Sequence, residues 1–386
     1  MSEVENREKI ECEICGSKVH AIEIHLRKEH PEMSITEYQK RFPDAPILSD
    51  YAKTLIEDRR KKRIEEARLS HSMPFFHEVF ELGTSDEAMS TTGKRPIPIH
   101  VFEKSGTETD DMIPALNKNY VFNTKELKYV MSGIEMNIPV YIWGHKGAGK
   151  TELFEQICAR TNRPLIRVQH TVNTEESQIV GQWTVRDGET RFEYGALPLA
   201  MINGWAYLAD EYDFAMPNVL ATYQAVLEGK PLMIKEAPAD LRVVKPHPNF
   251  RFFATGNTNG TGDETGLYQG TTIQNSANYD RFGIVVKKSY LDRASEVKIL
   301  CKNSKINEAD AQDMVSFATS VREAFDAGKI SDTISPRTLL FAAKLGIIHA
   351  SFRTGLRLAF LNKLSEIDCE TCDAFAQRIF GASDDV

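Results

Sequence analysis

The segment Gly144-His145-Lys146-Gly147-Ala148-Gly149-Lys150-Thr151 follows an apolar run at residues 139–143 and precedes a helical pattern at 152–160. A buried strand, a glycine-rich turn and a helix in this order are typical of a phosphate-binding loop. The glycines let backbone N–H groups curl around phosphate oxygens, and the helix turns the positive end of its dipole toward them. A chance glycine turn is the alternative, but the complete G-x-x-x-x-G-K-T pattern favours a nucleoside triphosphate site.

Polar residues with defined tasks complete the expected site. Lys150 should reach the β- and γ-phosphates, and Thr151 should hold Mg²⁺ through its hydroxyl. Further along, the apolar run at 205–209 ends in Asp210 and Glu211. Phosphate-loop ATPases need one carboxylate in the Mg²⁺ shell and another that polarises the attacking water. We therefore assign Asp210 to the metal and Glu211 to general-base catalysis.

The strand pattern around these motifs predicts an α/β fold. Five apolar runs have the length of strands, at residues 139–143, 164–168, 205–209, 250–255 and 281–286. Asn257 follows the fourth run, where its amide is expected to contact the γ-phosphate or the attacking water. A turn asparagine without such a role is the alternative. Two insertions are also expected, a hairpin at 181–192 around Asp187-Gly188 and a short apolar segment at 231–248.

The last part of the chain is predicted to be helical, and we interpret it as a lid over the nucleotide. Its expected helices lie at residues 292–301, 308–327, 336–350, 351–365 and 371–380. Arg337 stands behind Ser335-Pro336, a start signal that fixes the direction of the helix, so we expect Arg337 to fold back onto the phosphates. Another helix, with proline in its first turn, is predicted at 217–228.

A metal-binding pattern marks the N-terminal segment, where Cys12, Cys15, His25 and His30 occur in turn. Two cysteines in a tight knuckle and two histidines about one helical turn apart can close a tetrahedral Zn²⁺ site. Metal binding would let so short a segment fold without a large core. His20 is an alternative ligand, and a reduced surface pair of cysteines is the alternative to the whole site.

This spacing, with Glu37-Tyr38 and Phe42-Pro43 after it, resembles the single zinc finger of the bacterial Ros/MucR-type regulators. Those regulators bind DNA, and the basic run at 59–63 could contact phosphates. Acidic residues surround the run, at Glu57, Asp58, Glu65 and Glu66. They favour a solvated charged helix, so we expect a structural or partner-docking finger, with DNA binding as the less favoured interpretation.

Composition sets the broad class of the protein. With 386 residues and a net charge of -8, the chain has no global electrostatic reason to bind nucleic acid or an anionic membrane. No apolar run reaches the roughly 18 residues of a membrane helix, and the N-terminus is too polar for a secretory signal. The six cysteines do not suggest a disulfide scaffold in so long a chain. We expect a cytoplasmic protein.

Four parts are predicted along the chain. A zinc-finger-like module at 1–50 is followed at 51–119 by a charged helix and a linker or arm. The nucleotide-binding core occupies 120–288, and the helical lid occupies 289–386. The linker prediction depends on residues 83–114, where Ser, Thr, Gly, Pro and acidic residues replace a regular apolar pattern.

The phosphate loop, Asp210-Glu211, Asn257, Arg281 and Arg337 occur in an order that resembles an AAA+ ATPase. The two insertions point to the branch of MoxR-type ATPases and chelatase motor subunits. Longer stretches are similar to the small ATPase subunit of aerobic, ATP-dependent cobaltochelatases, at residues 210–213, 245–248, 250–255, 262–268, 335–338 and 360–363. This similarity runs from about residue 75 to residue 381.

The resemblance implies an AAA+ core, in which helices flank a five-stranded parallel sheet, with a helical lid. Members of that family form hexameric rings that hydrolyse MgATP. They work with a von Willebrand-type adaptor subunit and a large catalytic subunit. The large subunit inserts Co²⁺ into hydrogenobyrinic acid a,c-diamide during cobalamin synthesis. The implied cofactors are ATP and Mg²⁺, to which the finger adds a structural Zn²⁺.

The resemblance also assigns roles to two arginines. Arg281 becomes a finger supplied in trans to the γ-phosphate of a neighbouring subunit, a charge that can be worth on the order of 10³-fold or more in rate. An ion pair between Arg281 and Asp280 is the alternative. Arg337 becomes the sensor that the lid supplies in cis.

Two features depart from the family pattern. The zinc-finger-like module is not part of the usual subunit, and residues 176–181 replace an Ile-Asp-Leu-Val-Gly pattern. The main prediction is the motor subunit of a cobaltochelatase. The alternative is a MoxR-like remodelling ATPase that its finger recruits to another protein or to DNA.

Overall fold

The computed structural model describes residues 9–70, 73–263 and 266–381. Contacts divide the chain into two compact units, residues 1–99 and 100–386. Glu264 and Thr265, which belong to one of the stretches behind the cobaltochelatase resemblance, lie outside the described residues. None of the helices in the described ranges is long and apolar enough to cross a membrane.

The first unit begins with a small finger. Strands β1 (Ile10–Glu11) and β2 (Lys18–Val19) pair antiparallel and are followed by helices α1 (Ile22–Glu29) and α2 (Ile35–Arg41). Ser34 and Glu37 form a capping box that satisfies the free N–H groups at the start of α2. Four buried residues, Cys12, Ile22, Leu26 and Tyr38, make a core too small to hold the finger together alone.

The rest of this unit contains the charged helix α3 (Asp50–Ser70), the short helix α4 (Phe76–Val79) and a 3-10 turn, η1 (Asp86–Ala88). Arg60 of the basic run pairs with Asp86, with 2.7 Å between its Nη2 and Oδ1 of Asp86. The aromatic residues around α4, including Phe75, Phe76 and Phe80, are buried. At least one member of the basic run is therefore occupied within the chain.

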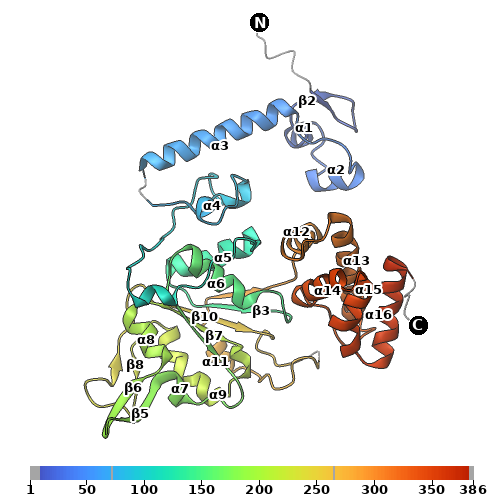
Figure 1. Ribbon diagram of the computed structural model, residues 1–386. Coiled ribbons are helices and arrows are strands. Elements are labelled where there is room, and N and C mark those ends of the chain that lie inside the picture. The colour runs from blue at the N-terminus through green and yellow to red at the C-terminus, as the bar shows by residue number, and fades with distance from the viewer. Residues whose placement is uncertain (1–8, 71–72, 264–265, 382–386) are drawn as a thin grey trace. The chain divides into compact units, whose positions relative to one another are not determined.

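The second unit is built on a five-stranded parallel sheet with the order β11-β3-β10-β7-β4. Its strands are β3 (Val140–Trp143), β4 (Leu165–Gln169), β7 (Ala206–Asp210), β10 (Arg251–Gly256) and β11 (Ile284–Lys287). All four pairings are parallel. Helices cover the faces of this sheet (Figure 1), and the inner strands are buried on both sides, as continuous apolar runs require.

The flanking helices are α5 (Thr124–Met136), α6 (Lys150–Arg160), α7 (Glu176–Val180), α8 (Ala196–Asn203) and α11 (Ser276–Tyr279), together with the 3-10 turns η2 (Glu108–Met112) and η3 (Tyr212–Phe214). The helix predicted at 217–228 is instead α9 (Pro217–Leu220), the 3-10 turn η4 (Ala221–Tyr223) and α10 (Gln224–Leu227). The 3-10 turn places the buried hydroxyl of Tyr223 within 2.8 Å of both His170 Nε2 and the Tyr207 hydroxyl.

Both insertions are antiparallel hairpins. The first consists of β5 (Gly181–Arg186) and β6 (Glu189–Tyr194), and the second of β8 (Leu232–Met233) and β9 (Val243–Val244). Asp187 and Gly188 both have positive φ, which is the geometry of the tight turn that an Asp-Gly pair favours. The first hairpin lies near β8 in Figure 1, and Trp183 Nε1 donates a hydrogen bond to the Glu236 carbonyl of the second insertion at 3.0 Å.

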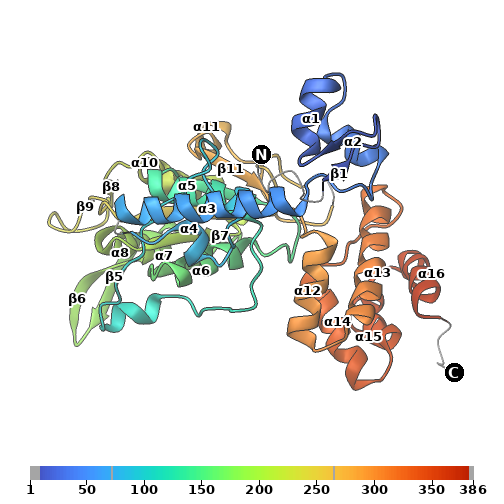
Figure 2. The ribbon, with the colours of Figure 1, turned by 90° about the horizontal axis from the view of Figure 1, so that it is seen from above.

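The C-terminal helices form a bundle with its own core (Figure 2). They are α12 (Arg293–Ser304), α13 (Glu308–Asp326), α14 (Pro336–Ile348), α15 (Phe352–Ala359) and α16 (Glu366–Phe380), with the 3-10 turn η5 (Leu361–Lys363) before the last. Each α-helix starts behind a side chain that caps its N-terminus, such as Ser335 before α14. The first predicted helix continues to Ser304, and the fourth ends early at Ala359.

Candidate nucleotide and metal sites

The glycine-rich loop joins the end of β3 to the start of α6, as its sequence predicts. Gly147 and Gly149 have φ values of 71° and 80°, where a side chain would strain the backbone. A Cβ on Gly147 would also lie 2.5 Å from Cβ of Ser335. Two independent reasons therefore require glycine at position 147: its positive φ, and the side chain of Ser335 in the lid, which packs against it.

Lys150 is buried at the start of α6 and points back along the loop. Its Nζ donates to the carbonyls of Gly144, at 2.7 Å, and His145, at 3.2 Å, and to Oδ1 of Asn257 at 2.9 Å. Burial lowers the pKa of Lys150 to about 8, although Asp213 and then Asp210 oppose this shift. The loop lysine and the asparagine after β10, predicted separately, are in direct contact.

Asp210 ends β7 with a buried side chain. Its Oδ1 accepts hydrogen bonds from Thr151 Oγ1, at 2.8 Å, and from the Thr255 hydroxyl. Thr151 and Asp210 are thus adjacent, and a hydroxyl next to a carboxylate is a donor set that suits Mg²⁺. These two residues would hold the ion.

Glu211 has a left-handed backbone conformation with φ of 53°, which is uncommon for a residue with a side chain. Its N–H donates to Oγ1 of Thr255 at 3.1 Å, and its carboxylate accepts from Nε2 of Gln169 at 3.2 Å. Because Asp210 and Glu211 differ in backbone conformation, their carboxylates bond different residues: Asp210 bonds Thr151 and Thr255, and Glu211 bonds Gln169. This separation is what two distinct roles require.

Asn257 is held in place by Asp213, a fully buried carboxylate. Oδ2 of Asp213 accepts from the N–H groups of Asn257 and Thr258, both at 2.8 Å, and from the Thr258 hydroxyl at 2.9 Å. Burial raises the pKa of Asp213 in spite of these hydrogen bonds. The loop after β10 is thereby anchored next to the phosphate-binding loop.

A cavity of about 510 Å³ unites these residues. It is lined by members of the glycine-rich loop and by polar residues from the sheet and the lid, among them Lys150, Thr151, Arg167, Asp210, Glu211, Asn257 and Arg337. Arg337, at the start of α14, reaches this lining from the lid. A second cavity of about 260 Å³ shares residues 147–149 of the loop and has an apolar lining that includes Tyr120, Val121, Leu291, Ile299 and Leu340. Such a lining suits the base of a nucleotide.

The first half of the loop is tied to other segments through Lys146. The Tyr268 hydroxyl accepts from the N–H of Lys146 at 3.0 Å and lies 3.0 Å from Nδ1 of His145. Nζ of Lys146 lies 2.5 Å from Oδ1 of Asp332 in the lid. The lid and the loop before α11 therefore both contact residues of the phosphate-binding loop.

Arg281 lies apart from this site. Its Nε donates to Oε1 of Glu228 at 2.7 Å, and its Nη1 donates to the Ala277 carbonyl at 2.5 Å. Within the described ranges, Arg281 is not part of the lining of the phosphate cavity. Its ion-pair partner is Glu228 rather than Asp280, and it leaves about a quarter of its side chain exposed.

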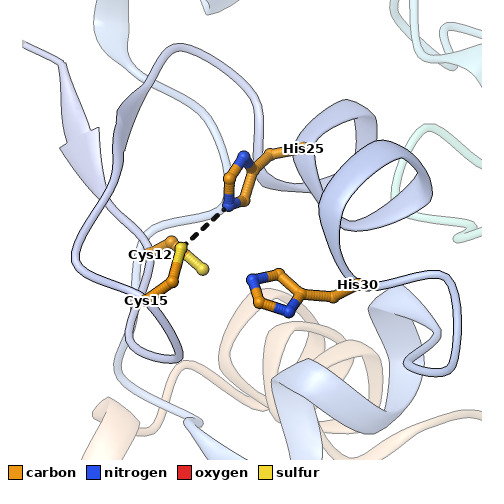
Figure 3. A group of neighbouring side chains, drawn as sticks. All are labelled: Cys12, Cys15, His25 and His30. Carbon is orange, nitrogen blue, oxygen red and sulfur yellow. Dashed lines mark hydrogen bonds between the residues drawn. The ribbon is translucent and has the colours of Figure 1, made fainter.

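The predicted zinc ligands lie together in the finger. The thiols of Cys12 and Cys15 and the rings of His25 and His30 point toward one another (Figure 3), with one ligand atom from each within 4.8 Å of the others. His20 instead bonds Ser49, with 2.8 Å between Nδ1 and Oγ. Hydrogen bonding with Ser17 is the largest cause that lowers the pKa of the Cys15 thiol to about 5.

This cluster fits Zn²⁺ by its donors and by its hydrogen bonds. Nε2 of His30 is buried and has no hydrogen-bond partner among the residues that the structure describes. The other ring nitrogen, Nδ1, lies 3.7 Å from a carboxylate oxygen of Glu32. A carboxylate behind one ring nitrogen and a free second nitrogen are the usual arrangement of a metal-ligating histidine.

Sequence reasoning missed several residues of the site. Arg167 and Gln169 reach Asp210 and Glu211 from the neighbouring strand β4. Tyr268 and the apolar lining of the second cavity were also missed. The polar alternation of Arg167 and Gln169 at the end of an apolar strand was the available signal for the first two.

A parallel sheet with a phosphate-binding loop after β3, an Asp-Glu pair after β7 and an asparagine after β10 defines a P-loop ATPase of the AAA+ class. Residues 139–271 match the AAA domain (dynein-related subfamily), and residues 296–379 match the CbbQ/NirQ/NorQ C-terminal family. The fold and the enzyme class predicted from the sequence are confirmed: the chain is an AAA+ ATP hydrolase, a class that implies ATP and Mg²⁺ as cofactors.

The aerobic cobaltochelatase subunit CobS of Sinorhizobium sp. is 36% identical to this chain over 304 residues, which are 73% of this chain and 90% of CobS. Midasin of Dictyostelium discoideum is 30% identical over 176 residues, covering 44% of this chain and 3% of midasin. Among solved structures, the RuvB Holliday junction branch migration motor of Thermotoga maritima shares 12% identity, with a TM-score of 0.40 over 71% of this chain and 76% of that one. The chain belongs to the CobS family of AAA+ ATPases.

Proposed function

We propose that this chain is the motor subunit of a cobaltochelatase. It hydrolyses MgATP, and a partner subunit uses that energy to insert Co²⁺ into hydrogenobyrinic acid a,c-diamide, a step of cobalamin biosynthesis. The observation that carries the proposal is the identity of 36% to CobS over 90% of its length. In the second unit, the loop lysine, the Asp-Glu pair, Asn257 and Arg337 line one cavity, which supports the proposal.

The chemistry follows from the roles proposed for these residues. Thr151 and Asp210 would hold Mg²⁺, which would supply positive charge against the β- and γ-phosphates. Lys150 binds the same phosphates, and Glu211 orients and deprotonates the attacking water. Asn257, which contacts Nζ of Lys150, senses the γ-phosphate, and Arg337 senses it from the lid.

Completion of the site requires a second copy of the chain. Arg281 is held on the surface by Glu228, away from the cavity of its own chain. In a ring, which we expect to be hexameric, that surface would face the nucleotide of a neighbour, where Arg281 stabilises the charge of the transition state. Assembly therefore controls the rate of hydrolysis.

The energy has to leave this chain by conformational change, because no open metal site for a transferred cobalt ion is found among the described residues. The two hairpins are the elements that we assign to this transfer. Trp183, Val185, Met233 and Val243 expose about half or more of their surface there. An apolar surface on paired hairpins suits contact with an adaptor of the von Willebrand type and with a large chelatase subunit.

The finger is assigned a structural Zn²⁺ held by Cys12, Cys15, His25 and His30. Two thiols and two imidazoles would supply all four ligands of a structural Zn²⁺, which would leave no open position for catalysis. Arg60, in the basic run, is already paired with Asp86. These features favour docking of a protein over binding of DNA.

Reconstitution tests the proposed function. The chain is mixed with adaptor and large chelatase subunits, the corrin substrate, Co²⁺ and ATP, and insertion is followed by absorbance. Insertion should depend on this chain and should fail with Glu211→Gln. Insertion at the same rate without this chain would contradict the chelatase assignment.

A second candidate is a MoxR-like remodelling ATPase that its finger recruits to another client. The match of the lid to the CbbQ/NirQ/NorQ C-terminal family favours it, as does the finger with its Cys/His cluster, which offers a separate docking module. ATP-dependent remodelling of a protein bound to the finger, without any effect on cobalt insertion, would favour this candidate.

A further inference from the structure

Strand β4 presents two polar side chains to the carboxylates at the end of β7. In the parallel register, Arg167 lies opposite Leu208 and Gln169 lies opposite Asp210. Residues two apart on a strand share a face of the sheet, so both side chains lie on the face that carries Asp210. Gln169 bonds Glu211, and Arg167 bonds Asp210.

The contact between Arg167 and Asp210 takes up one whole carboxylate oxygen. Nε and Nη2 of Arg167 lie 2.8 and 2.6 Å from Oδ2 of Asp210. The other oxygen, Oδ1, accepts from Thr151 and Thr255. Four donors on one buried carboxylate use its lone pairs almost completely.

A second carboxylate stands on the other side of the guanidinium. Oε1 of Glu155, on α6, lies 3.4 Å from Nη1 of Arg167. Burial raises the pKa of Glu155, and Arg167 opposes this rise. All three side chains line the phosphate cavity, and nearly half of the Arg167 side chain is exposed there. The guanidinium can therefore move between two acceptors without leaving the cavity.

We infer that Arg167 is a positioning residue. Its guanidinium acts as a counter-ion for Oδ2 of Asp210 in the free protein, and Mg²⁺ takes the place of the guanidinium when the metal arrives with the nucleotide. Arg167 then moves onto Glu155. This inference rests on the proposed role of Asp210 as the metal carboxylate. It gives β4 a task in metal loading that the sequence did not indicate.

The physical reason for such a device is the cost of an unpaired buried charge. A carboxylate as buried as that of Asp210 is destabilising unless a cation or several hydrogen bonds compensate it. Arg167 supplies that cation and keeps the carboxylate oriented toward Thr151. The same bond competes with the metal, so loading requires the guanidinium to give way.

The test measures metal binding directly, with Mn²⁺ as the probe and free Mn²⁺ followed by electron paramagnetic resonance, in the presence of ADP. Arg167→Gln removes the competing cation and should lower the half-saturating Mn²⁺ concentration about three- to fivefold, the scale of one partly exposed ion pair. Arg186→Gln, which removes an exposed arginine from its pair with Glu193 in the first hairpin, is the matched control and should have no effect.

A double-mutant cycle separates exchange from a general charge effect. Glu155→Gln removes the alternative acceptor, so it should raise the half-saturating Mn²⁺ concentration of the wild type and have no effect when Arg167→Gln is also present. Equal effects of Glu155→Gln in both backgrounds, or weaker Mn²⁺ binding by Arg167→Gln, would overturn the inference. Asp210→Asn should abolish the tight binding. If it does not, the assignment of Asp210 to the metal is wrong as well.

Discussion

Lys146 in the phosphate-binding loop and Asp332 in the lid form an ion pair, with 2.5 Å between Nζ and Oδ1. The hydroxyl of Tyr290, between the core and α12, donates a hydrogen bond to the Lys146 carbonyl at 3.3 Å. The hydroxyl of Tyr268 accepts a hydrogen bond from the N–H of Lys146. One residue of the loop is therefore bonded by three separate segments. Movement of the lid must change at least one of these bonds.

Asp332→Asn should loosen the lid over the bound nucleotide. Because both partners are partly exposed, we expect only a modest effect, a release of ADP about two- to fivefold faster at low salt. The difference from wild type should shrink at high salt, where the ion pair is screened. Stopped-flow release of a fluorescent ADP measures this rate. Asp50→Asn, which removes an exposed pair with Lys53 in the first unit, is the control and should leave the rate unchanged.

Glu211→Gln should keep ATP binding and lose at least about a hundredfold in hydrolysis, since only the base that orients water is removed. Lys150→Ala should instead weaken nucleotide binding itself. Equilibrium binding of ATP and steady-state phosphate release separate the two effects. Turnover by Glu211→Gln near the wild-type rate would show that another group is the base.

The pKa of Lys150, lowered to about 8, predicts that ATP binding weakens at alkaline pH. In the nucleotide-free protein, Lys150 loses its proton above pH 8. The phosphates of ATP favour the charged form of Lys150, so above pH 8 the protein must take up a proton when ATP binds. The dissociation constant should rise by up to about tenfold per pH unit above pH 8. Calorimetry in buffers of different ionisation enthalpy measures this uptake. If the affinity for ATP does not change between pH 7.5 and pH 9.5, the pKa of Lys150 is not lowered in this way.

Above pH 8, the contribution of Lys150 to protein stability should increase with pH, whereas the affinity for ATP should decrease. An unfolded lysine keeps its proton up to about pH 10.4, whereas the folded Lys150 releases it near pH 8. The unfolded chain then binds more protons, and the contribution of Lys150 to the free energy of unfolding rises with pH. Lys150→Met should remove this contribution, as denaturant unfolding of the free protein at several pH values would show.

Arg281 should act on the nucleotide of a neighbour. Arg281→Ala and Lys150→Ala chains should each be inactive, while an equal mixture should regain part of the ATPase activity, because each supplies what the other lacks. Steady-state hydrolysis at a fixed total concentration checks this. Normal activity of Arg281→Ala alone would contradict the assignment.

The full chain should contain one Zn²⁺, and Cys12→Ser should lose it. Elemental analysis after dialysis measures the ratio of metal to protein. His20→Ala is the matched control, because His20 bonds Ser49 and lies outside the cluster. A full complement of zinc in Cys12→Ser, or its loss in His20→Ala, would show that the ligands are misassigned.

Much of this fold was predictable, because its motifs fix local conformation. The five predicted strands start within three residues of the observed ones and alternate with helices as expected. The hairpin around Asp187 and the lid helix that carries Arg337 also formed as predicted. In each case, a glycine, a proline or a capping residue determines the backbone within a few positions.

The remaining features depend on contacts between distant segments. The periodicity of β4 does not reveal that β7 is its neighbour, so the pairs Arg167 with Asp210 and Gln169 with Glu211 could not be derived. The same holds for Glu228, which pairs with Arg281 from a segment 53 residues earlier in the chain. The division of the chain into four parts remains a prediction.

The strand order has a consequence for how the protein is made. β3, which leads into the phosphate-binding loop, lies between β10 and β11, and Val140 pairs with Phe253 and Ile284. On the ribosome, this apolar strand emerges long before either neighbour has been translated. The ATPase centre is therefore among the last parts of the core to fold. A nascent chain that stalls before β11 leaves β3 as an unpaired, aggregation-prone edge strand for chaperones to bind.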